Sequence, residues 1–206
     1  MKFKIWNREL EFDIEKEIIT YKDKVFTPAI RTYGDMEKLY ETKLDLDKKT
    51  PLYFMFRDVY FEDEEKEILD KNTIRYDITI LSPQMFWEEY NKTYGHYHPK
   101  NKDWNDYREI YQVLSWKAIY LQQNRQESFY TKANIWDQVI METWFGHVTI
   151  NPSDSEYLVM ANYVEAWWNS IYNEYREFDG ANFLYKTNWF EINNKYQNNI
   201  LIEEKK

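Results

Sequence analysis

Arg75-Tyr-Asp-Ile-Thr-Ile-Leu81 is the clearest strand pattern in the chain, because polar and apolar side chains alternate and most apolar ones are β-branched or aromatic. Leu52-Tyr-Phe-Met-Phe56 has the same character. Six further segments, separated by polar turn clusters, fit strands as well: residues 94–98, 109–114, 118–121, 139–141, 148–150 and 157–163. Many short strands joined by turns predict an all-β fold, an antiparallel barrel or jelly roll.

A few helices are expected at the periphery. Residues 34–41 are predicted to be helical with Asp35 as the N-cap, and Ser82-Pro83 is predicted to open a short helical turn. Near the C-terminus, large apolar residues recur at three-to-four spacing and predict a helix packed on the barrel: Trp167, Trp168, Ile171, Tyr172, Tyr175 and Phe178. The tail, residues 193–206, is expected to be flexible after about Tyr196.

Composition predicts one soluble domain. The 206 residues include 9 Trp, 19 Tyr and 12 Phe, enough to fill a sizeable core, and no linker or repeat divides them. We therefore expect a single domain over residues 1–206, with its core at about 25–185. The absence of cysteine excludes a disulfide scaffold, a zinc–thiolate site and thiol catalysis. No apolar run long enough to span a membrane and no secretory signal are present, so a cytoplasmic location is expected.

The charge distribution argues against nucleic acid as a partner. The net charge is −9, and Lys and Arg form no basic stripe. The charged run at residues 62–71 is interpreted as a solvated surface. To bind an anionic metabolite, this acidic protein would need a local binding site made either of hydroxyl and amide groups or of a metal ion.

The three histidines predict such a metal. His96 and His98 are two residues apart, so on a strand they share a face, and Glu109 opens a later strand on which Tyr111 has the same orientation. His147 begins another strand. Three imidazoles and a carboxylate suit one divalent Fe, Mn, Ni or Zn ion per chain. The alternative is that each histidine is an ordinary hydrogen-bonded residue.

Five motifs resemble the cupin superfamily and, within it, the cupin-type (archaeal-type) glucose-6-phosphate isomerases. They are Arg31-Thr-Tyr-Gly-Asp-Met36, Thr79-Ile-Leu-Ser-Pro83, Thr93-Tyr-Gly-His-Tyr-His98, Glu109-Ile-Tyr111 and His147-Val-Thr-Ile-Asn151. The resemblance implies a cupin jelly-roll barrel and a homodimer. It also implies metal-dependent interconversion of glucose 6-phosphate and fructose 6-phosphate.

Site roles follow from the same resemblance. Metal ligands would be His96, His98, Glu109 and His147. The sugar phosphate would contact Thr79, Thr93 and Gly95, in a hydroxyl–amide site that needs no arginine, and Tyr111 and Tyr163 would line the substrate cavity. Glu109 and Tyr111 would be catalytic, with Glu109 moving a proton between C2 and C1 of the sugar; a hydride shift is the alternative chemistry.

Three departures concern the substrate end. The segment 135–147 lacks the Pro-Gly that usually opens the second cupin motif, and Phe54 stands where the family has a cavity tyrosine. The family also has a histidine after the position of Tyr163; this histidine is absent here, and Asn169 is the residue nearest to its place. The alternatives are another cupin metalloenzyme, either a related sugar-phosphate isomerase or a dioxygenase, and a non-catalytic sugar-binding cupin. The full ligand set argues against the binding protein, and Thr79, Thr93 and Gly95 argue against the dioxygenase.

Overall fold

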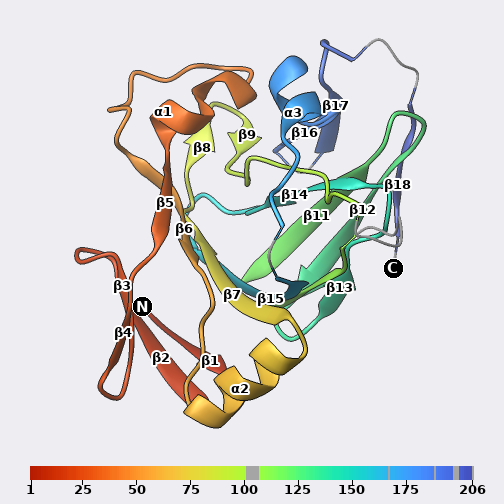
Figure 1. Cartoon of the computed structure of the whole chain (residues 1–206). Coiled ribbons are helices and arrows are strands. Elements are labelled where there is room, and N and C mark those ends of the chain that lie inside the picture. Colours follow the sequence, from red (N-terminus) through yellow and green to blue (C-terminus); the bar gives the residue numbers. More distant parts are fainter. Residues whose placement is uncertain (101–106, 167, 188, 197–199, 206) are drawn as a thin grey trace.

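The computed structural model describes residues 1–100, 107–166, 168–187, 189–196 and 200–205 (Figure 1). Two sheets form its centre. A six-stranded sheet has the order β13 (Gln138–Ile140), β10 (Glu109–Ser115), β15 (Leu158–Glu165), β7 (Ile74–Leu81), β6 (Pro51–Phe56) and β5 (Ala29–Thr32). The facing sheet has the order β14 (Gly146–Ile150), β11 (Lys117–Gln123), β12 (Ser128–Asn134) and β18 (Ile202–Glu204). All pairings are antiparallel except β12 with β18. The predicted all-β antiparallel fold is confirmed.

Apolar side chains between the two sheets form the central core. Leu158, Met160 and Val113 of the larger sheet pack with Ala118 and Tyr120 of the smaller one. The rings of Tyr111 and Tyr120 lie 5.4 Å apart across this space. The two sheets therefore enclose a closed interior at one end and leave room for a cavity at the other.

Strand β7 is largely buried on both faces although its polar and apolar residues alternate. Ile78 and Ile80 pack against an N-terminal meander on the outside of the sheet. The residues between them, Asp77 and Thr79, are buried as well, on the face toward the interior. The polar half of the pattern thus lines a cavity, whereas in a half-buried strand it would face solvent.

The core reaches further toward both termini than residues 25–185. The N-terminal meander, β1 (Lys2–Ile5), β2 (Arg8–Asp13), β3 (Ile18–Tyr21) and β4 (Lys24–Phe26), buries Phe3, Ile5, Leu10, Phe12 and Ile19. At the other end, β18 within the tail pairs with β12, and the expected flexibility of the tail stays a prediction.

Besides the N-terminal meander, a further small sheet packs on the smaller central sheet. Its order is β17 (Trp189–Ile192), β16 (Phe183–Lys186), β9 (Glu89–Tyr90) and β8 (Met85–Phe86). Phe183 and Tyr185 pack on Ile119 and Leu121 of β11, covering the outside of the smaller sheet.

The predicted helices are shorter or displaced. Helix α1 (Tyr33–Met36) and the 3₁₀ turn η1 (Glu37–Leu39) begin after Thr32, which is the N-cap. Asp35 occupies the third helical position, where its carboxylate accepts the Thr32 N–H at 2.9 Å in a capping box. Ser82 caps no helix, because its hydroxyl donates to the Leu52 carbonyl at 3.0 Å.

The expected helix over residues 167–178 reduces to α3 (Asn173–Glu177). Ile171 exchanges backbone hydrogen bonds with Tyr97, which holds the preceding segment extended; Trp167 lies outside the described residues. A helix that no pattern indicated, α2 (Asp63–Lys71), carries the charged run and buries none of its residues, so the solvated surface is confirmed. No helix of the described residues is long and apolar enough to cross a membrane.

Candidate metal centre

A cavity of about 320 Å³ lies over the inner face of the larger sheet. Strands of the larger sheet supply most of its wall through their inward-facing residues. The rest comes from the loop that carries His96 and from residues 168–170 and 172. These elements are far apart in sequence, so only the folded barrel assembles the site.

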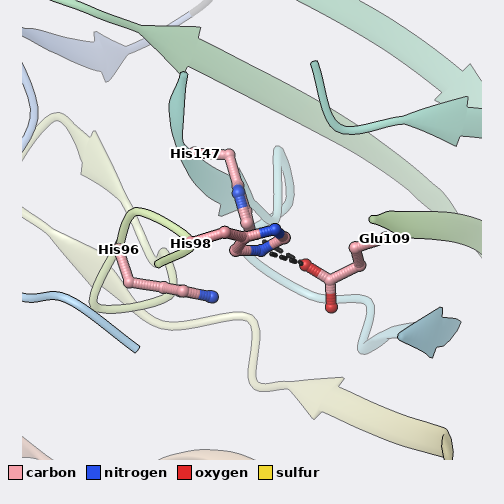
Figure 2. Close-up of side chains that lie close together, drawn as sticks. All are labelled: His96, His98, Glu109 and His147. Atoms are coloured by element: carbon pink, nitrogen blue, oxygen red, sulfur yellow. Dashed lines mark hydrogen bonds and ion pairs between the residues drawn. The ribbon is translucent and has the colours of Figure 1, made fainter. Parts of the chain in front are cut away.

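Four side chains converge beside this cavity (Figure 2), and two of them, His96 and Glu109, line it; the four are His96, His98, Glu109 and His147. One potential ligand atom from each lies within 4.8 Å of the others. Ligands at about 2.0–2.2 Å from a metal are separated by about 3 Å when adjacent and about 4.3 Å when opposite. The spacing of the cluster is close to these separations, so the four residues could hold one ion.

Backbone pairing sets the two histidine segments against each other. The His96 N–H donates to the His147 carbonyl at 3.2 Å, and the His147 N–H donates to the His96 carbonyl at 3.0 Å. The predicted strand 94–98 is wrong in this detail: it contains isolated bridges at His96 and Tyr97. Gly95 interrupts the extended backbone with a φ of +81°.

The glycines before His96 and His147 are required by close packing. A Cβ on Gly95 would lie 2.4 Å from the Tyr175 ring, and a Cβ on Gly146 would lie 2.6 Å from the Tyr97 ring. Both contacts are far below van der Waals distance, and the left-handed backbone at Gly95 adds strain for any other residue. The two glycines thus let the histidines approach each other.

Neighbouring groups orient the ligand atoms. His98 Nδ1 lies 2.5 Å from the Tyr107 carbonyl, so Nδ1 carries the proton and the Nε2 lone pair faces the cluster. Nε2 of His98 is 3.1 Å from Glu109 Oε2. The other carboxylate oxygen, Oε1, accepts a hydrogen bond from Asn162 Nδ2 at 2.7 Å. These contacts match the outer-shell support typical of metal-ligating side chains.

The buried His147 imidazole lacks the hydrogen bonds that buried polar groups usually form. It is 2% exposed, and neither ring nitrogen has a hydrogen-bond partner among the described residues. Its Nε2 lies 3.2 Å from Glu109 Oε2, but without hydrogen-bond geometry. Two lone-pair-bearing atoms that converge without bonding each other fit a cation held between them.

The electrostatics favour the protonation state that a metal requires. Burial lowers the pKa of His147, and burial together with the neighbouring His147 lowers the pKa of His96. Burial opposes ionisation of Glu109, yet the imidazoles of His147 and His98 hold the pKa of its carboxyl well below the usual range. At neutral pH His96 and His147 are therefore neutral and Glu109 is ionised, which are the forms that bind a metal.

Most of the predicted substrate residues line the same cavity. Thr79, Thr93, Gly95 and Tyr111 all contribute to its wall. Tyr111 is 8% exposed, and burial followed by the nearby Glu109 carboxylate raises the pKa of its phenol, so it stays a hydrogen-bond donor at neutral pH. The structure thus brings these four residues together at one cavity, and their role in binding substrate stays a prediction.

Tyr163 does not line the cavity, and this prediction is wrong. On β15, Asn162 faces inward, so its neighbour Tyr163 points to the outer surface, where its ring lies 4.7 Å from that of Tyr76. The same alternation applies on β6. Tyr53 faces the cavity, and Phe54 packs in the outer core.

Several cavity residues were missed from sequence. Arg57 and Arg75 line the wall, which the sequence reasoning did not anticipate. Arg75 shares a strand face with Thr79, and this parity alone could have indicated it. Trp168 was assigned to a helix, but its ring lies 4.4 Å from that of His98 and 5.9 Å from that of His96. It covers the two imidazoles from one side.

Solved structures similar to this chain share little of its sequence. An oxalate oxidase is 11% identical, covers 68% of this chain and 66% of its own length, and has a TM-score of 0.46. An oxalate decarboxylase of Bacillus subtilis is 14% identical with coverages of 64% and 29% and a TM-score of 0.43. Vicilin from Capsicum annuum is 13% identical with coverages of 70% and 31% and a TM-score of 0.43. The chain thus spans less than two thirds of each structure.

A family profile gives the assignment. No curated protein matches. The profile described as "Glucose-6-phosphate isomerase (GPI)" matches residues 30–201, most of the chain, including every ligand of the cluster. With its jelly-roll barrel and its three histidines and glutamate at the inner cavity, the chain belongs to the cupin-type glucose-6-phosphate isomerase family.

Proposed function

We propose that this protein is a metal-dependent aldose–ketose isomerase that interconverts glucose 6-phosphate and fructose 6-phosphate. The observation that carries the proposal is the convergence of His96, His98, Glu109 and His147 within 4.8 Å at a cavity large enough for a small metabolite. The family assignment supports the substrate class.

The four converging residues would hold one divalent ion of Fe, Mn, Ni or Zn. Nitrogen and carboxylate ligands suit each of these ions, and a four-residue set leaves coordination positions open. When bound, the ion supplies Lewis acidity to the sugar oxygens at which charge develops.

The phosphate would be bound by hydroxyl and backbone groups of Thr79, Thr93 and Gly95. Thr93 is well placed for this role, since its Oγ1 accepts the Thr149 N–H at 3.0 Å and its hydroxyl proton remains available to donate. Its own N–H is committed to the Thr149 carbonyl at 2.8 Å, which fixes the loop in place.

Glu109 would transfer the proton between C2 and C1 on one face of the sugar. Its Oε1 is fixed by Asn162 and its Oε2 faces two imidazoles, so a base role requires it to leave the ligand set. A hydride shift needs no such movement and is the alternative. In both routes the Tyr111 phenol, held beside Glu109 in the cavity wall, would donate a hydrogen bond to a substrate hydroxyl.

A coupled assay tests the proposal. Glucose 6-phosphate formed from fructose 6-phosphate is measured as NADPH with a dehydrogenase, first after EDTA treatment and then after addition of Fe, Mn, Ni or Zn. Turnover restored by at least one metal is expected. Absence of turnover with all four would contradict the proposal and direct the assay to mannose 6-phosphate. A homodimer acting in the cytoplasm belongs to the same proposal, and sedimentation equilibrium checks the dimer.

A further inference from the structure

Two arginines form a charged cluster in the cavity wall, on the inner face of the larger sheet. Arg57 follows β6 and Arg75 lies on β7, and Asp77 lies buried between them. Arg57 Nη1 donates to Asp77 Oδ2 at 2.6 Å, and Arg75 Nε donates to Oδ1 at 2.8 Å. The Asp58 N–H adds a third bond to the carboxylate at 2.9 Å. The cluster carries two positive charges and one negative charge.

Asp77 fixes the arginines without using all their donors. Its side chain is 1% exposed, whereas the side chains of Arg57 and Arg75 are 49% and 28% exposed. Arg75 binds the carboxylate only through Nε, and its two terminal nitrogens have no hydrogen-bond partner in the described part of the chain. Guanidinium groups held in this way present N–H donors suited to a phosphate or a carboxylate.

The cluster lies away from the end of the cavity that carries Thr93 and Gly95. The Tyr53 hydroxyl contacts the Tyr94 N–H at 3.3 Å, beside Thr93 and Gly95. Arg57 follows Tyr53 by four residues, about 13 Å of extended chain. Thr79 pairs with Met55 and follows Asp77 by two residues, about 7 Å, so it lies between Tyr53 and the arginines. Thr93 and Gly95 and the arginines therefore mark two different ends of the cavity, with Thr79 between them.

Glu109 connects the arginine end with the metal cluster. Glu109 and Arg75 both pair with Val164 of β15, so they occupy one row across the sheet, about 10 Å apart. Arg57 is also within electrostatic range of Glu109 and Tyr111. An anion on the sugar end nearest the metal ligands would thus meet the arginines.

We propose that Arg57 and Arg75, positioned by Asp77, form a second anionic subsite, so that the cavity binds sugars with an anionic group at each end. This inference rests on the proposed function, because Thr79, Thr93 and Gly95 take the first phosphate. Hexose bisphosphates and phosphorylated aldonic acids have this chemistry. They bind in competition with the monophosphate and inhibit its isomerisation.

Calorimetric titration of the metal-loaded protein tests the subsite with three compounds. Glucitol 6-phosphate carries one anionic group, 6-phosphogluconate adds a carboxylate, and fructose 1,6-bisphosphate adds a second phosphate. Arg57→Gln is expected to weaken the two doubly anionic compounds about 10- to 100-fold, as loss of hydrogen bonds to a charged group does. Glucitol 6-phosphate should change less than about threefold, since screening limits the distant charge effect. A loss confined to one compound identifies the second anion as phosphate or as carboxylate.

Matched variants separate the subsite from other causes. Arg75→Gln, tested in parallel, leaves Arg57 on Asp77, so the test survives if one variant fails to fold. Arg125→Gln removes the same charge from a side chain that is 79% exposed and lies outside the cavity wall, and all three affinities should stay as in the wild type.

Two results overturn the inference: equal affinities in Arg57→Gln and wild type, or an equal loss for all three compounds. If the wild type isomerises fructose 6-phosphate but gains no affinity from a second anion, only the subsite fails. If it neither binds glucitol 6-phosphate nor isomerises fructose 6-phosphate, the proposed function fails.

Discussion

Asn162 donates a hydrogen bond from Nδ2 to Glu109 Oε1 at 2.7 Å, across the paired strands β15 and β10. The bond leaves Oε2 of the same carboxylate facing the His98 and His147 imidazoles at 3.1 and 3.2 Å. Both residues are buried, so the amide holds the carboxylate rotamer in a region where water competes little. An outer-shell amide is therefore part of the cluster geometry.

Asn162→Ala should lower metal affinity about 10- to 100-fold, because removal of an outer-shell partner releases the ligand that it orients. Competition with a metal-binding dye measures the affinity. Tyr163→Phe is the matched control: the neighbouring residue faces the outer surface, and the variant should bind metal as the wild type does. Equal affinity in Asn162→Ala and wild type would show that the amide does not orient Glu109.

His96→Ala should reduce the metal content of the purified protein well below one ion per chain. The three histidines of the chain all lie in the cluster, so no other imidazole can replace the lost ligand. Elemental analysis of wild type and variant, purified in parallel, gives the stoichiometry. Retention of one ion per chain by His96→Ala would contradict the proposed ligand set.

The individual ligand motifs of the metal cluster were recognisable because each one is local, whereas their convergence depends on the barrel. The sequence shows two histidines separated by one residue and a glutamate that opens a strand. It also shows a glycine directly before each of the two histidine segments. The alternation in β7 likewise predicted the strand. These features need no knowledge of how the sheets pack.

The missed features depend on tertiary packing. The orientation of Tyr163 follows from the register of β15 against β10, where Asn162 pairs with Tyr111. The arginine end of the cavity exists only because the polar face of β7 is turned inward. The sequence of helix α2, DEEKEILDK, has no apolar stripe that would reveal a helix, and none of its residues is buried. The bridge between Tyr97 and Ile171, far apart in sequence, replaced an expected helix.

Thr93→Ala should weaken binding of glucitol 6-phosphate about 10- to 150-fold, since a lost contact to a charged group costs about 1.5–3 kcal/mol. Metal content should be unchanged, because Thr93 is not a ligand. Thr93→Ser keeps the hydroxyl and should bind within a few-fold of wild type. Calorimetric titration measures the three affinities; equal values for Thr93→Ala and wild type would argue against the hydroxyl–amide site.

Alkaline pH should unfold the protein cooperatively, because many of its tyrosines are buried. Burial raises the pKa of Tyr53 to about 12 and raises that of Tyr120 further above the ordinary value. Above pH 10 the unfolded chain releases phenolic protons that the folded chain retains, so stability decreases as pH rises through this range. Absorbance at 295 nm reports tyrosinate and circular dichroism reports folding. The last phenols should ionise together with the loss of structure; full ionisation in a folded protein would contradict this.

Glu109→Gln should reduce isomerase turnover by about 100- to 10,000-fold, the usual cost of losing a general base. The amide is nearly isosteric with the carboxylate but cannot accept a proton from C2, and it is also the poorer metal ligand. Because both effects lower the rate, the coupled assay is run at metal concentrations that saturate the variant, as shown by elemental analysis. Asn162→Ala under the same saturating conditions is the control, since it disturbs the Glu109 rotamer and keeps the carboxylate; it should retain far more activity. A Glu109→Gln variant that binds metal and turns over at the wild-type rate would exclude Glu109 as the base and favour the hydride shift.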